Sequence, residues 1–399
     1  MKKLMILGGS RYALPVIQAA RELGVFVITA DYLPNNFAHR YADEYCNVSI
    51  VDQEATLLAA RERAIDGIVS FACDPGVLTA AYVAEEMGLP SVGSFEAVSI
   101  LQNKQRFRAF LAEHGFNVPT AKGYTSVEAA VKDVDRFHWP VIVKPTDSAG
   151  SKGVRRVDDP AKFRDAIEYA ISFSRGKEFI VEDFITQQGF SSDSDCFSVD
   201  GALKFISFNS QRFDSKAENP YTPAAYSWPS TMSEAHRQEL SSELQRLIKL
   251  LGLGTSLFNV ETREGTDGKA YIMECSPRGG GNRLAECLER ATGVKLIENT
   301  VRAAVGLPLW KVEQLPYREH WAEIILHSNK AGIFDRLWIS DVIQDHVAEC
   351  DLWVDSGAEV NCFTGANKAI GTVFLKFDTQ ERLNEVLNAQ EEFIRVELK

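Results

Sequence analysis

Residues 256–278 read SLFNVETREGTDGKAYIMECSPR and contain two runs of alternating apolar side chains on either side of Asp267-Gly268. Asp-Gly is a favoured two-residue type I′ turn, so this stretch predicts a β-hairpin. With the turn at these two residues, Glu261 and Glu274 become cross-strand partners on one face, with Cβ atoms roughly 4.5–5.5 Å apart. The sequence therefore predicts two opposed carboxylates in an otherwise apolar ribbon.

Opposed carboxylates destabilise a sheet unless a shared proton or a divalent cation holds them together. Mg²⁺ suits such a pair because it takes one or two carboxylates and completes its shell with substrate phosphates. Ser276 shares the face of Glu274, and Asn259 is expected opposite Ser276, so both offer further oxygen donors. An alternative stays open, in which the hairpin has an ordinary solvent-facing polar side and a one-residue bulge separates the acids.

Lys144 lies late in the apolar run 139–145, where a lysine is costly to bury without an anion. The loop that follows, residues 147–153, has small residues whose backbone N–H groups can approach phosphate oxygens. It lacks the G-x-x-x-x-G-K-[ST] pattern, and a hairpin loop with a snorkelling lysine is the alternative. Glu182 and Asp183 end a second apolar run. They are either an ordinary strand end, or they present backbone N–H and C=O groups and a carboxylate to an adenine edge.

The first hundred residues alternate short apolar runs with helical patterns, which predicts a parallel sheet covered on both faces. The turn at 8–11 and Asp31 superficially suggest a dinucleotide site. The G-x-G-x-x-G spacing is absent, however, so NAD binding is not expected. A substrate pocket at the carboxyl edge of this sheet would use Arg11 or Asp74.

Residues 101–306 have an α+β pattern, and residues 307–399, which follow proline breaks, look like a small closing domain. We expect a mobile surface loop at residues 210–230, which are polar and punctuated by proline. Thr231-x-x-Glu234 predicts a capping box before a helix with leucines at helical spacing. The predicted fold class is thus α/β followed by α+β, in three domains at 1–100, 101–306 and 307–399.

The composition limits the classes of partner. The chain has 399 residues, with 43 Lys and Arg against 55 Asp and Glu, so its net charge is −12. Because no basic cluster opposes this charge, nucleic acid and membrane surfaces are not expected as partners. The seven cysteines are scattered and lack C-x-x-C spacing, which predicts reduced core thiols and a cytoplasmic location.

Taken in order, these pieces resemble the ATP-grasp superfamily, and most closely the carboxylate–amine ligases built like biotin carboxylase and the carbamoyl phosphate synthase large subunit. The likeness spans essentially the whole chain and implies a Rossmann-like N-terminal domain, a two-lobed nucleotide-binding domain and a small C-terminal domain. The motifs that carry it are residues 103–104, 141–145, 148–154, 181–185, 259–261 and 274–278.

The resemblance implies ATP and Mg²⁺ (or Mn²⁺) as cofactors. It implies that Glu261 and Glu274 hold the metal with Ser276, which stands where the family often has Asn, and that Arg278 and Lys144 are catalytic. For Arg278, a salt bridge with a neighbouring acid is the structural alternative. The residues implied to bind ATP are Lys104, Lys144, Ser148, Gly150, Ser151, Lys152, Gly153, Glu182, Asp183, Phe184, Ile185, Asp193 (a guess for the ribose, where the family has Glu) and Met273 (under the base). Substrate contacts are expected from Arg278, Gly280 and Asn282.

The implied activity is ATP-dependent ligation of small molecules: a carboxylate attacks the γ-phosphate to give an acyl phosphate and ADP, and an amine then displaces phosphate. Lys104 and Lys144 would neutralise the phosphates, because phosphoryl transfer needs positioning and charge neutralisation. Arg278 would brace the carboxylate and then the oxyanion. Homodimers are common among similar enzymes. Three alternatives stay open: activation of bicarbonate or formate, a nucleotide-binding regulator without turnover, and an NAD-dependent dehydrogenase.

Overall fold

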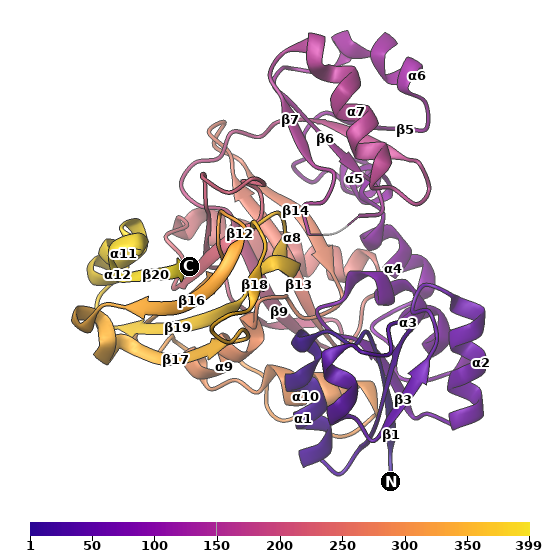
Figure 1. Cartoon of the computed structure of the whole chain (residues 1–399). Coiled ribbons are helices and arrows are strands. Elements are labelled where there is room, and N and C mark those ends of the chain that lie inside the picture. The colour runs from indigo at the N-terminus through magenta and orange to yellow at the C-terminus, as the bar shows by residue number, and fades with distance from the viewer. Residues whose placement is uncertain (149) are drawn as a thin grey trace.

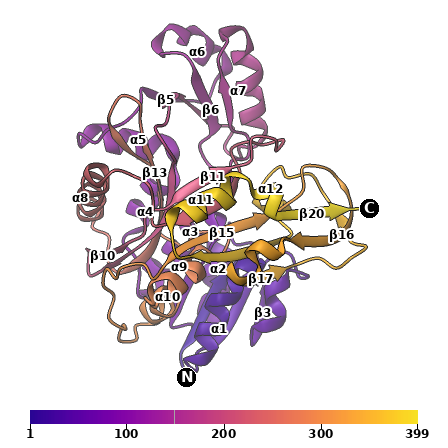
Figure 2. The ribbon, with the colours of Figure 1, turned by 90° about the vertical axis from the view of Figure 1, so that its left-hand side faces the viewer.

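The computed structural model describes residues 1–148 and 150–399. The chain has three parts: an N-terminal parallel sheet, a small antiparallel lobe, and a larger body of antiparallel sheets that includes the C-terminus (Figures 1 and 2). The predicted combination of α/β and α+β architecture is confirmed.

The N-terminal part is a parallel sheet with strand order β3-β2-β1-β4. Its elements are β1 (Lys3–Leu7), α1 (Leu14–Glu22), β2 (Phe26–Asp31), β3 (Glu44–Asn47), α2 (Gln53–Arg63), β4 (Gly67–Ser70) and α3 (Asp74–Met87). Alternate side chains of β1 enter two apolar clusters: Leu4 and Ile6 pack with α1, whereas Met5 and Leu7 pack with α2 and α3. Burial on both faces explains why these strands are almost continuously apolar.

Asp31 braces the turns at the carboxyl edge of this sheet. Its carboxylate accepts hydrogen bonds from the backbone N–H groups of Gly9 (3.1 Å) and Leu33 (2.9 Å) and from Asn36 Nδ2 (2.9 Å). Both oxygens are therefore used by the protein itself, in the position where a dinucleotide site would need a free carboxylate.

The small lobe is an antiparallel sheet with the order β5-β8-β6-β7. Its elements, with the two helices that precede it, are α4 (Phe95–Gln102), α5 (Lys104–Glu113), β5 (Ala121–Tyr124), α6 (Val127–Lys132), β6 (Val141–Pro145), β7 (Arg155–Val157), α7 (Phe163–Ser172) and β8 (Phe179–Asp183). One face of the sheet packs against α6 and α7 in a single apolar cluster, and Figure 1 shows this lobe standing apart from the rest.

The central sheet has the order β10-β9-β13-β14 and contains the predicted hairpin. Its elements and their covering helix are β9 (Ser192–Val199), β10 (Ala202–Ile206), α8 (Glu234–Leu250), β13 (Ser256–Glu264) and β14 (Ala270–Ser276). The predicted leucines of α8 are buried against one face. The predicted capping box is wrong: Ser233 is the N-cap, because its Oγ accepts from His236 N (3.2 Å), whereas Thr231 N donates to Ser210 Oγ (3.0 Å).

The expected mobile loop at 210–230 is also wrong. It contains β11 (Ser210–Phe213) and β12 (Pro223–Trp228), which continue the five-stranded sheet β11-β12-β15-β19-β17. Tyr226 and Trp228 are fully buried there. Two of the prolines that suggested a loop, Pro223 and Pro229, lie at the ends of β12, where proline is tolerated. This sheet joins strands from both sides of the domain boundary predicted at residue 306.

The rest of the chain completes this sheet and adds a smaller one, β18-β16-β20. The elements are α9 (Leu284–Thr292), α10 (Leu296–Ala304), β15 (His320–Leu326), β16 (Gly332–Ile339), β17 (Val347–Leu352), β18 (Glu359–Val360), β19 (Gly371–Phe377), α11 (Gln380–Asn388), α12 (Gln390–Phe393) and β20 (Ile394–Leu398). Helix α10 packs beside α1 of the N-terminal part, as Figure 1 shows.

The structure also bears on membrane-spanning helices and on the cysteines. No helix within residues 1–148 and 150–399 is long and apolar enough to cross a membrane. All seven cysteines are free, but the prediction that all are core thiols is wrong, because Cys350 is exposed on the edge strand β17.

Candidate functional site

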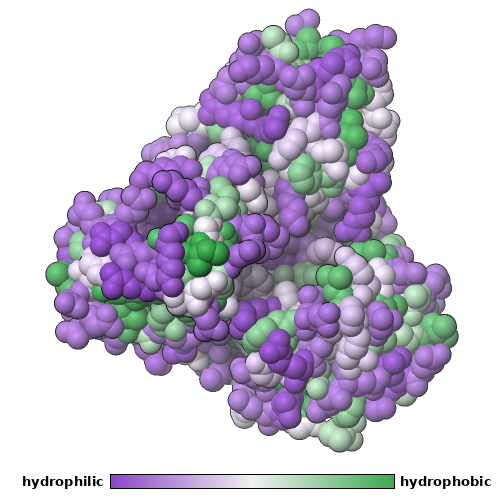
Figure 3. Space-filling view, in the orientation of Figure 1, coloured by the Kyte–Doolittle hydropathy of each residue, from purple (hydrophilic) through white to green (hydrophobic). Residues whose placement is uncertain are grey.

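A cavity of about 310 Å³, called here the central cavity, lies where the three parts meet. Figure 3 shows the molecule hollowed there between the small lobe and the two larger parts. The sequence-predicted residues that line it are Lys104, Lys144, Ser148, Gly150, Ser151, Glu182, Asp183, Phe184, Ile185, Asp193, Glu261, Met273, Glu274, Ser276, Arg278 and Asn282. Lys152 lines an adjoining cavity, and Gly153 and Gly280 are buried behind the walls. The fold thus collects residues that are far apart in the sequence.

Glu261 and Glu274 are cross-strand partners on β13 and β14, as predicted. The prediction of a two-residue turn is wrong. Gly265 N donates to Lys269 O (2.8 Å), so the loop consists of the three residues 266–268. A bulge at Met273, between the acids and the turn, skips one residue on β14 and restores the register. The three-residue loop shifts the pairing by one residue, and the bulge shifts it back. Without the bulge, Glu261 would face Met273 instead of Glu274.

The third strand, β9, extends the pair into two polar rows across the sheet. In the first row Asp193, Glu261 and Glu274 are neighbours on adjacent strands, and in the second row Asp195, Asn259 and Ser276 are neighbours. Two rows on one face of a sheet form a polar floor at one end of the central cavity.

Cationic side chains lie beside two of the three acids of the first row, Glu261 and Glu274. Lys104 Nζ lies 3.2 Å from Glu274 Oε1 and donates to Ser148 O (3.0 Å), whereas Arg263 Nη2 lies 3.5 Å from Glu261 Oε1. Burial and the charge of Glu274 raise the pKa of Glu261. Although burial opposes it, Lys104 and Lys144 lower the pKa of Glu274.

The donor set of this floor fits Mg²⁺. Among the residues that the structure describes, no group of three or more His, Cys, Asp or Glu side chains has a metal-binding arrangement. Glu261 and Glu274 therefore offer a pair of hard oxygen ligands, and the remaining positions would be left to phosphates and water. Mg²⁺ uses this arrangement in phosphoryl-transfer sites.

Glu182 of β8 forms a buried ionic triad with Lys144 of β6 and Arg108 of α5. Lys144 Nζ lies 2.8 Å from Glu182 Oε2, and Arg108 Nε lies 2.9 Å from Glu182 Oε1. Against the effect of burial, these cations lower the pKa of Glu182 to about 2. Burial lowers the pKa of Lys144, and Glu182 partly offsets this. Sequence reasoning missed Arg108, for which an arginine among the apolar positions of α5 was the only signal.

These contacts leave no carboxylate of the 182–183 pair for an adenine edge, so that part of the prediction is wrong. Glu182 is committed to the triad, and Asp183 accepts from both the backbone N and the Nδ1 of His138 (2.8 Å each). Only the backbone of these residues is left to face a base. Ile142, Phe184 and Met273 form an apolar lining at this end of the central cavity.

The loop after β6 is tied to the opposite wall. Ser151 Oγ donates to Tyr221 O (2.9 Å), and Asn219 Nδ2 donates to Ser151 O (3.2 Å) and Thr364 O (3.3 Å). Gly153 has φ +75°, and a Cβ there would lie 2.8 Å from Pro145 Cγ, so the loop requires glycine at this point. Ala149 lies outside the described residues.

Arg278 is held by the N-terminal part. Its Nε and Nη2 each lie 2.8 Å from an oxygen of Asp74 at the start of α3, and its Nη1 donates to Asn259 Oδ1 (2.9 Å). Ser276 Oγ donates to Asp74 Oδ1 (3.1 Å) and accepts from Gln102 Nε2 (2.8 Å). The salt bridge is therefore present, and it fixes the orientation of a guanidinium that still lines the central cavity.

A chain of hydrogen bonds continues from this point. Tyr12 OH donates to Asn282 Oδ1 (3.1 Å), Asn282 Nδ2 donates to Tyr226 OH (3.4 Å), and Tyr226 OH donates to Asp193 Oδ2 (3.1 Å). Asn282 has φ +56°, a conformation that is uncommon for a residue other than glycine. Sequence reasoning missed Tyr12 and Tyr226, which are brought here by the turn after β1 and by β12.

Arg11, which was predicted together with Asp74 as a possible substrate-pocket residue, does not line the central cavity. Its guanidinium carbon lies 3.5 Å from the ring centroid of Phe37. Asp31 and Arg11 are thus both used in local packing, and of the groups proposed at this sheet edge only Asp74 reaches the cavity.

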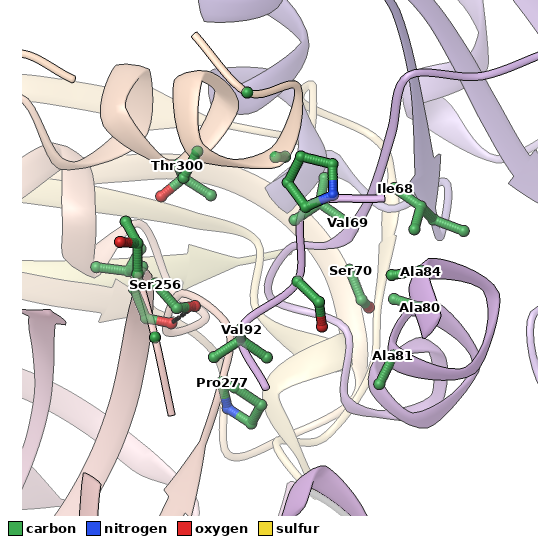
Figure 4. A pocket seen from close by; sticks show the side chains of 18 of the residues that line it. Ile68, Val69, Ser70, Ala80, Ala81, Ala84, Val92, Ser256, Pro277 and Thr300 are labelled. Carbon is green, nitrogen blue, oxygen red and sulfur yellow. Dashed lines mark hydrogen bonds between the residues drawn. The ribbon is translucent and has the colours of Figure 1, made fainter. Parts of the chain in front are cut away.

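A second cavity, of about 840 Å³, is larger but has different chemistry. It lies between β4, α3, α10 and the start of β13, and Figure 4 shows Val69, Ala81, Val92 and Thr300 around it. Its lining is mostly aliphatic and contains no lysine or arginine. It therefore lacks the charges that a polyphosphate needs, and the central cavity is the candidate site despite its smaller volume.

Comparisons with known proteins identify a domain family for part of the chain and similar folds for the whole. Residues 137–286 match the family model described as an ATP-grasp domain. In sequence, the chain is 25% identical over 253 residues to the carbamoyl phosphate synthase large chain of Thermotoga neapolitana. This match covers 63% of the chain and 22% of that protein, so the chain spans less than a quarter of the relative's length.

In structure, the chain is similar to the L-amino acid ligase from Bacillus licheniformis, with a TM-score of 0.80, 18% identity, and coverage of 100% of this chain and 99% of that one. It is also similar to the biotin carboxylase domain of the Hydrogenobacter thermophilus 2-oxoglutarate carboxylase, whose structure contains MgADP and bicarbonate. There the TM-score is 0.75, the identity is 17%, and 99% and 90% of the two chains are covered. The family match identifies residues 137–286 as an ATP-grasp domain, in agreement with the resemblance of the motifs, and the two structural similarities show a shared fold.

Proposed function

We propose that this protein is an ATP-dependent ligase that activates a carboxylate as an acyl phosphate and joins it to an amine, with release of ADP and phosphate. The observation that carries the proposal is the direct pairing of Glu261 and Glu274 on the floor of a cavity that Lys104 and Lys144 also line. Paired acids beside lysines match the needs of a metal-bound triphosphate.

The lining suggests how ATP would lie. The base would occupy the apolar end, between Ile142, Phe184 and Met273, and the phosphates would extend toward Lys144 and the loop at 148–153. Backbone N–H groups in such a loop of small residues can bind phosphate oxygens. Bound Mg²⁺ would neutralise charge on the phosphates, and Glu261 and Glu274 would hold it.

Lys104 would change partners when the nucleotide binds. It now contacts Glu274 and the carbonyl of Ser148. With the metal on Glu274, its ammonium group would be free to contact a phosphate, so one ionic contact replaces another at little cost. Lys144 keeps its contact with Glu182 and provides a fixed charge.

Arg278 would act on the carboxylate and on the oxyanion that develops during phosphoryl and acyl transfer. Its planar group is oriented before substrate arrives by Asp74 and Asn259. Preorganised donors stabilise charge more effectively than mobile ones, because no reorganisation is needed during the reaction.

A second candidate function is activation of bicarbonate. The observation in its favour is the structural neighbour from Hydrogenobacter thermophilus, which was solved with MgADP and bicarbonate. Bicarbonate would use the same nucleotide and metal residues, so the two functions differ only in the acid that attacks the γ-phosphate.

The experiment is a screen of L-amino acids, small carboxylates, formate and bicarbonate with MgATP, in the presence and absence of hydroxylamine. The proposal predicts ADP release and a trapped hydroxamate with at least one organic carboxylate. ADP release with bicarbonate alone would support the second candidate. Binding of MgATP without ADP or hydroxamate in any reaction would contradict both and indicate a regulator.

A further inference from the structure

The inference concerns the end of the central cavity beyond the metal acids and rests on the proposed function. This end, called here the acceptor end, is lined by Tyr12, Asp74, Asp193, Tyr226, Arg278 and Asn282. Its residues come from the N-terminal turn, α3, β9, β12 and the loop after β14. The hydrogen bonds from Tyr12 through Asn282 and Tyr226 to Asp193 give it a fixed shape.

The acids around the cavity differ in whether the protein supplies a countercharge. Glu182, Glu261 and Glu274 each have a lysine or arginine within 3.5 Å, and Asp74 has Arg278. Among the described residues, Asp193 and Asp195 have no cationic side chain within ion-pair distance.

Asp193 is bonded only by neutral groups, since its Oδ1 accepts from Asn259 Nδ2 (2.7 Å) and its Oδ2 from Tyr226 OH (3.1 Å). Asp195, two residues along the same face, is fully buried. One of its oxygens accepts from Gly280 N (2.8 Å), and the other has no hydrogen-bond partner among the described residues. Two adjacent carboxylates in a desolvated position without a countercharge are costly.

The charge balance at the acceptor end is negative, because Arg278 is matched by Asp74 in a bidentate pair. Asp193 therefore remains as an unmatched charge that faces the cavity, with Asp195 behind it. The other lining groups, Tyr12, Tyr226 and Asn282, are neutral. A phosphorylated amine would bring close to two negative charges beside Asp193, where the one cation of the acceptor end, Arg278, is already paired with Asp74.

We propose that Asp193 binds the primary ammonium group of a substrate, so that the amine partner of the ligation is a cationic, unphosphorylated amine such as an amino acid. The ligand supplies the countercharge that the fold leaves out. Arg278 lies at the other end of Asn259, whose Oδ1 accepts from the guanidinium and whose Nδ2 donates to Asp193. The side-chain amide of Asn259 thus lies between the guanidinium of Arg278 and the carboxylate of Asp193. This arrangement complements a zwitterion, whose carboxylate would face Arg278 and whose ammonium group would face Asp193. This assigns Asp193 to the amine and not to the ribose.

The first arm of the test uses the unmodified chain and needs no variant. Each L-amino acid, its N-acetyl derivative and its des-amino acid are compared by thermal unfolding with MgADP and by ADP release with MgATP. In the presence of the carboxylate identified by the screen, we expect a thermal shift, and ADP release above the level with that carboxylate alone, only for compounds with a free ammonium group. Equal responses to the N-acetyl compounds, or no shift with any amine, would overturn the proposal.

The second arm compares Asp193→Asn with Asp200→Asn, the same change in the exposed turn that follows β9. Asp193→Asn should raise the KM for the amine about tenfold or more, because a charge-assisted hydrogen bond is lost. It should leave the Kd of MgADP within about twofold, and Asp200→Asn should change neither. An unchanged KM, or weaker MgADP binding in Asp193→Asn, would overturn the assignment.

The two proposals fail in distinguishable ways. Hydroxamate formed from a carboxylate, together with thermal shifts and amide formation that do not require a free ammonium group, would leave the ligase intact and remove the amine subsite. A thermal shift with free amines but no ADP or hydroxamate would support the subsite and contradict the ligase.

Discussion

Glu182 and Glu274 line the same cavity, yet the protein treats the two carboxylates differently. The Glu182 side chain is 1% exposed and has two cations, Arg108 and Lys144, within 2.9 Å. The Glu274 side chain is 45% exposed and has Lys104, which also bonds Ser148. Glu182, a buried acid with two fixed cationic partners, serves the structure and is called here a framework acid. Glu274 faces the cavity and shares its one cation with Ser148, so it can exchange that cation for a ligand and is called here an exchangeable acid.

The largest effect that this comparison predicts is on catalysis. Glu274→Gln should lower turnover about 1,000-fold or more, because the metal loses one of its two carboxylates. The unfolding temperature should change little, since the side chain faces the cavity. Turnover under saturating MgATP and thermal unfolding measure the two effects. Glu243→Gln, on the surface of α8, is the control, and full activity in Glu274→Gln would refute the metal site.

The next effect is on stability. Glu182→Gln should reduce the free energy of unfolding of the small lobe by about 3–5 kcal/mol, because it leaves two buried cations with no countercharge. Breaking the exposed Arg336–Glu397 pair with Glu397→Gln should cost at most about 1 kcal/mol. Urea unfolding of both variants measures the difference, and equal losses would contradict the distinction between framework and exchangeable acids.

The pH dependence of stability follows from the same triad. The pKa of Glu182 in the folded state, about 2, lies below the ordinary value near 4.3. Its contribution is therefore complete above about pH 4.3 and is lost as the pH falls toward 2. Acid titration of unfolding should show this loss in the unmodified chain and a smaller one in Glu182→Gln.

A smaller effect is expected on nucleotide affinity. Lys144→Ala should weaken MgADP binding about tenfold, because a fixed charge near the phosphates is removed. Lys122→Ala, which removes an exposed lysine of the same lobe, should leave affinity unchanged. Isothermal titration measures both, and equal affinities would show that Lys144 serves only the triad.

The smallest effect is the pH dependence of metal–nucleotide binding. The pKa of Glu261 is raised by burial and by Glu274, so its carboxylate takes up a proton at a higher pH than an ordinary glutamate. Metal binding requires the ionised form, and MgADP affinity should therefore fall as the pH is lowered, by at most about tenfold per unit. Glu261→Gln should flatten this dependence.

Sequence reasoning succeeded where local pattern decides structure. Apolar runs and helical spacing predicted the parallel sheet, and the alternation around Asp267-Gly268 predicted the partners Glu261 and Glu274, although a three-residue turn and a bulge had to cancel. It failed at β12, where prolines at the ends of the strand concealed a segment whose residues 224–228 are all buried.

The ionic partners could not be predicted, because they depend on tertiary packing. Asp74 and Arg278 are separated by 204 residues and meet only when α3 approaches the end of β14. Likewise, nothing in the run that contains Glu182 shows that Arg108 and Lys144 will surround it. The pattern identifies charged residues in apolar segments, and the fold determines which countercharges they receive.

The most direct test of the account is a crystal structure with Mg²⁺ and a non-hydrolysable ATP analogue. The account predicts a metal ion about 2.0–2.1 Å from an oxygen of both Glu261 and Glu274, with Lys104 Nζ moved from Glu274 to a phosphate and Glu182 unchanged between its two cations. A nucleotide bound elsewhere, or bound here with Lys104 still on Glu274 and no metal between the acids, would contradict it.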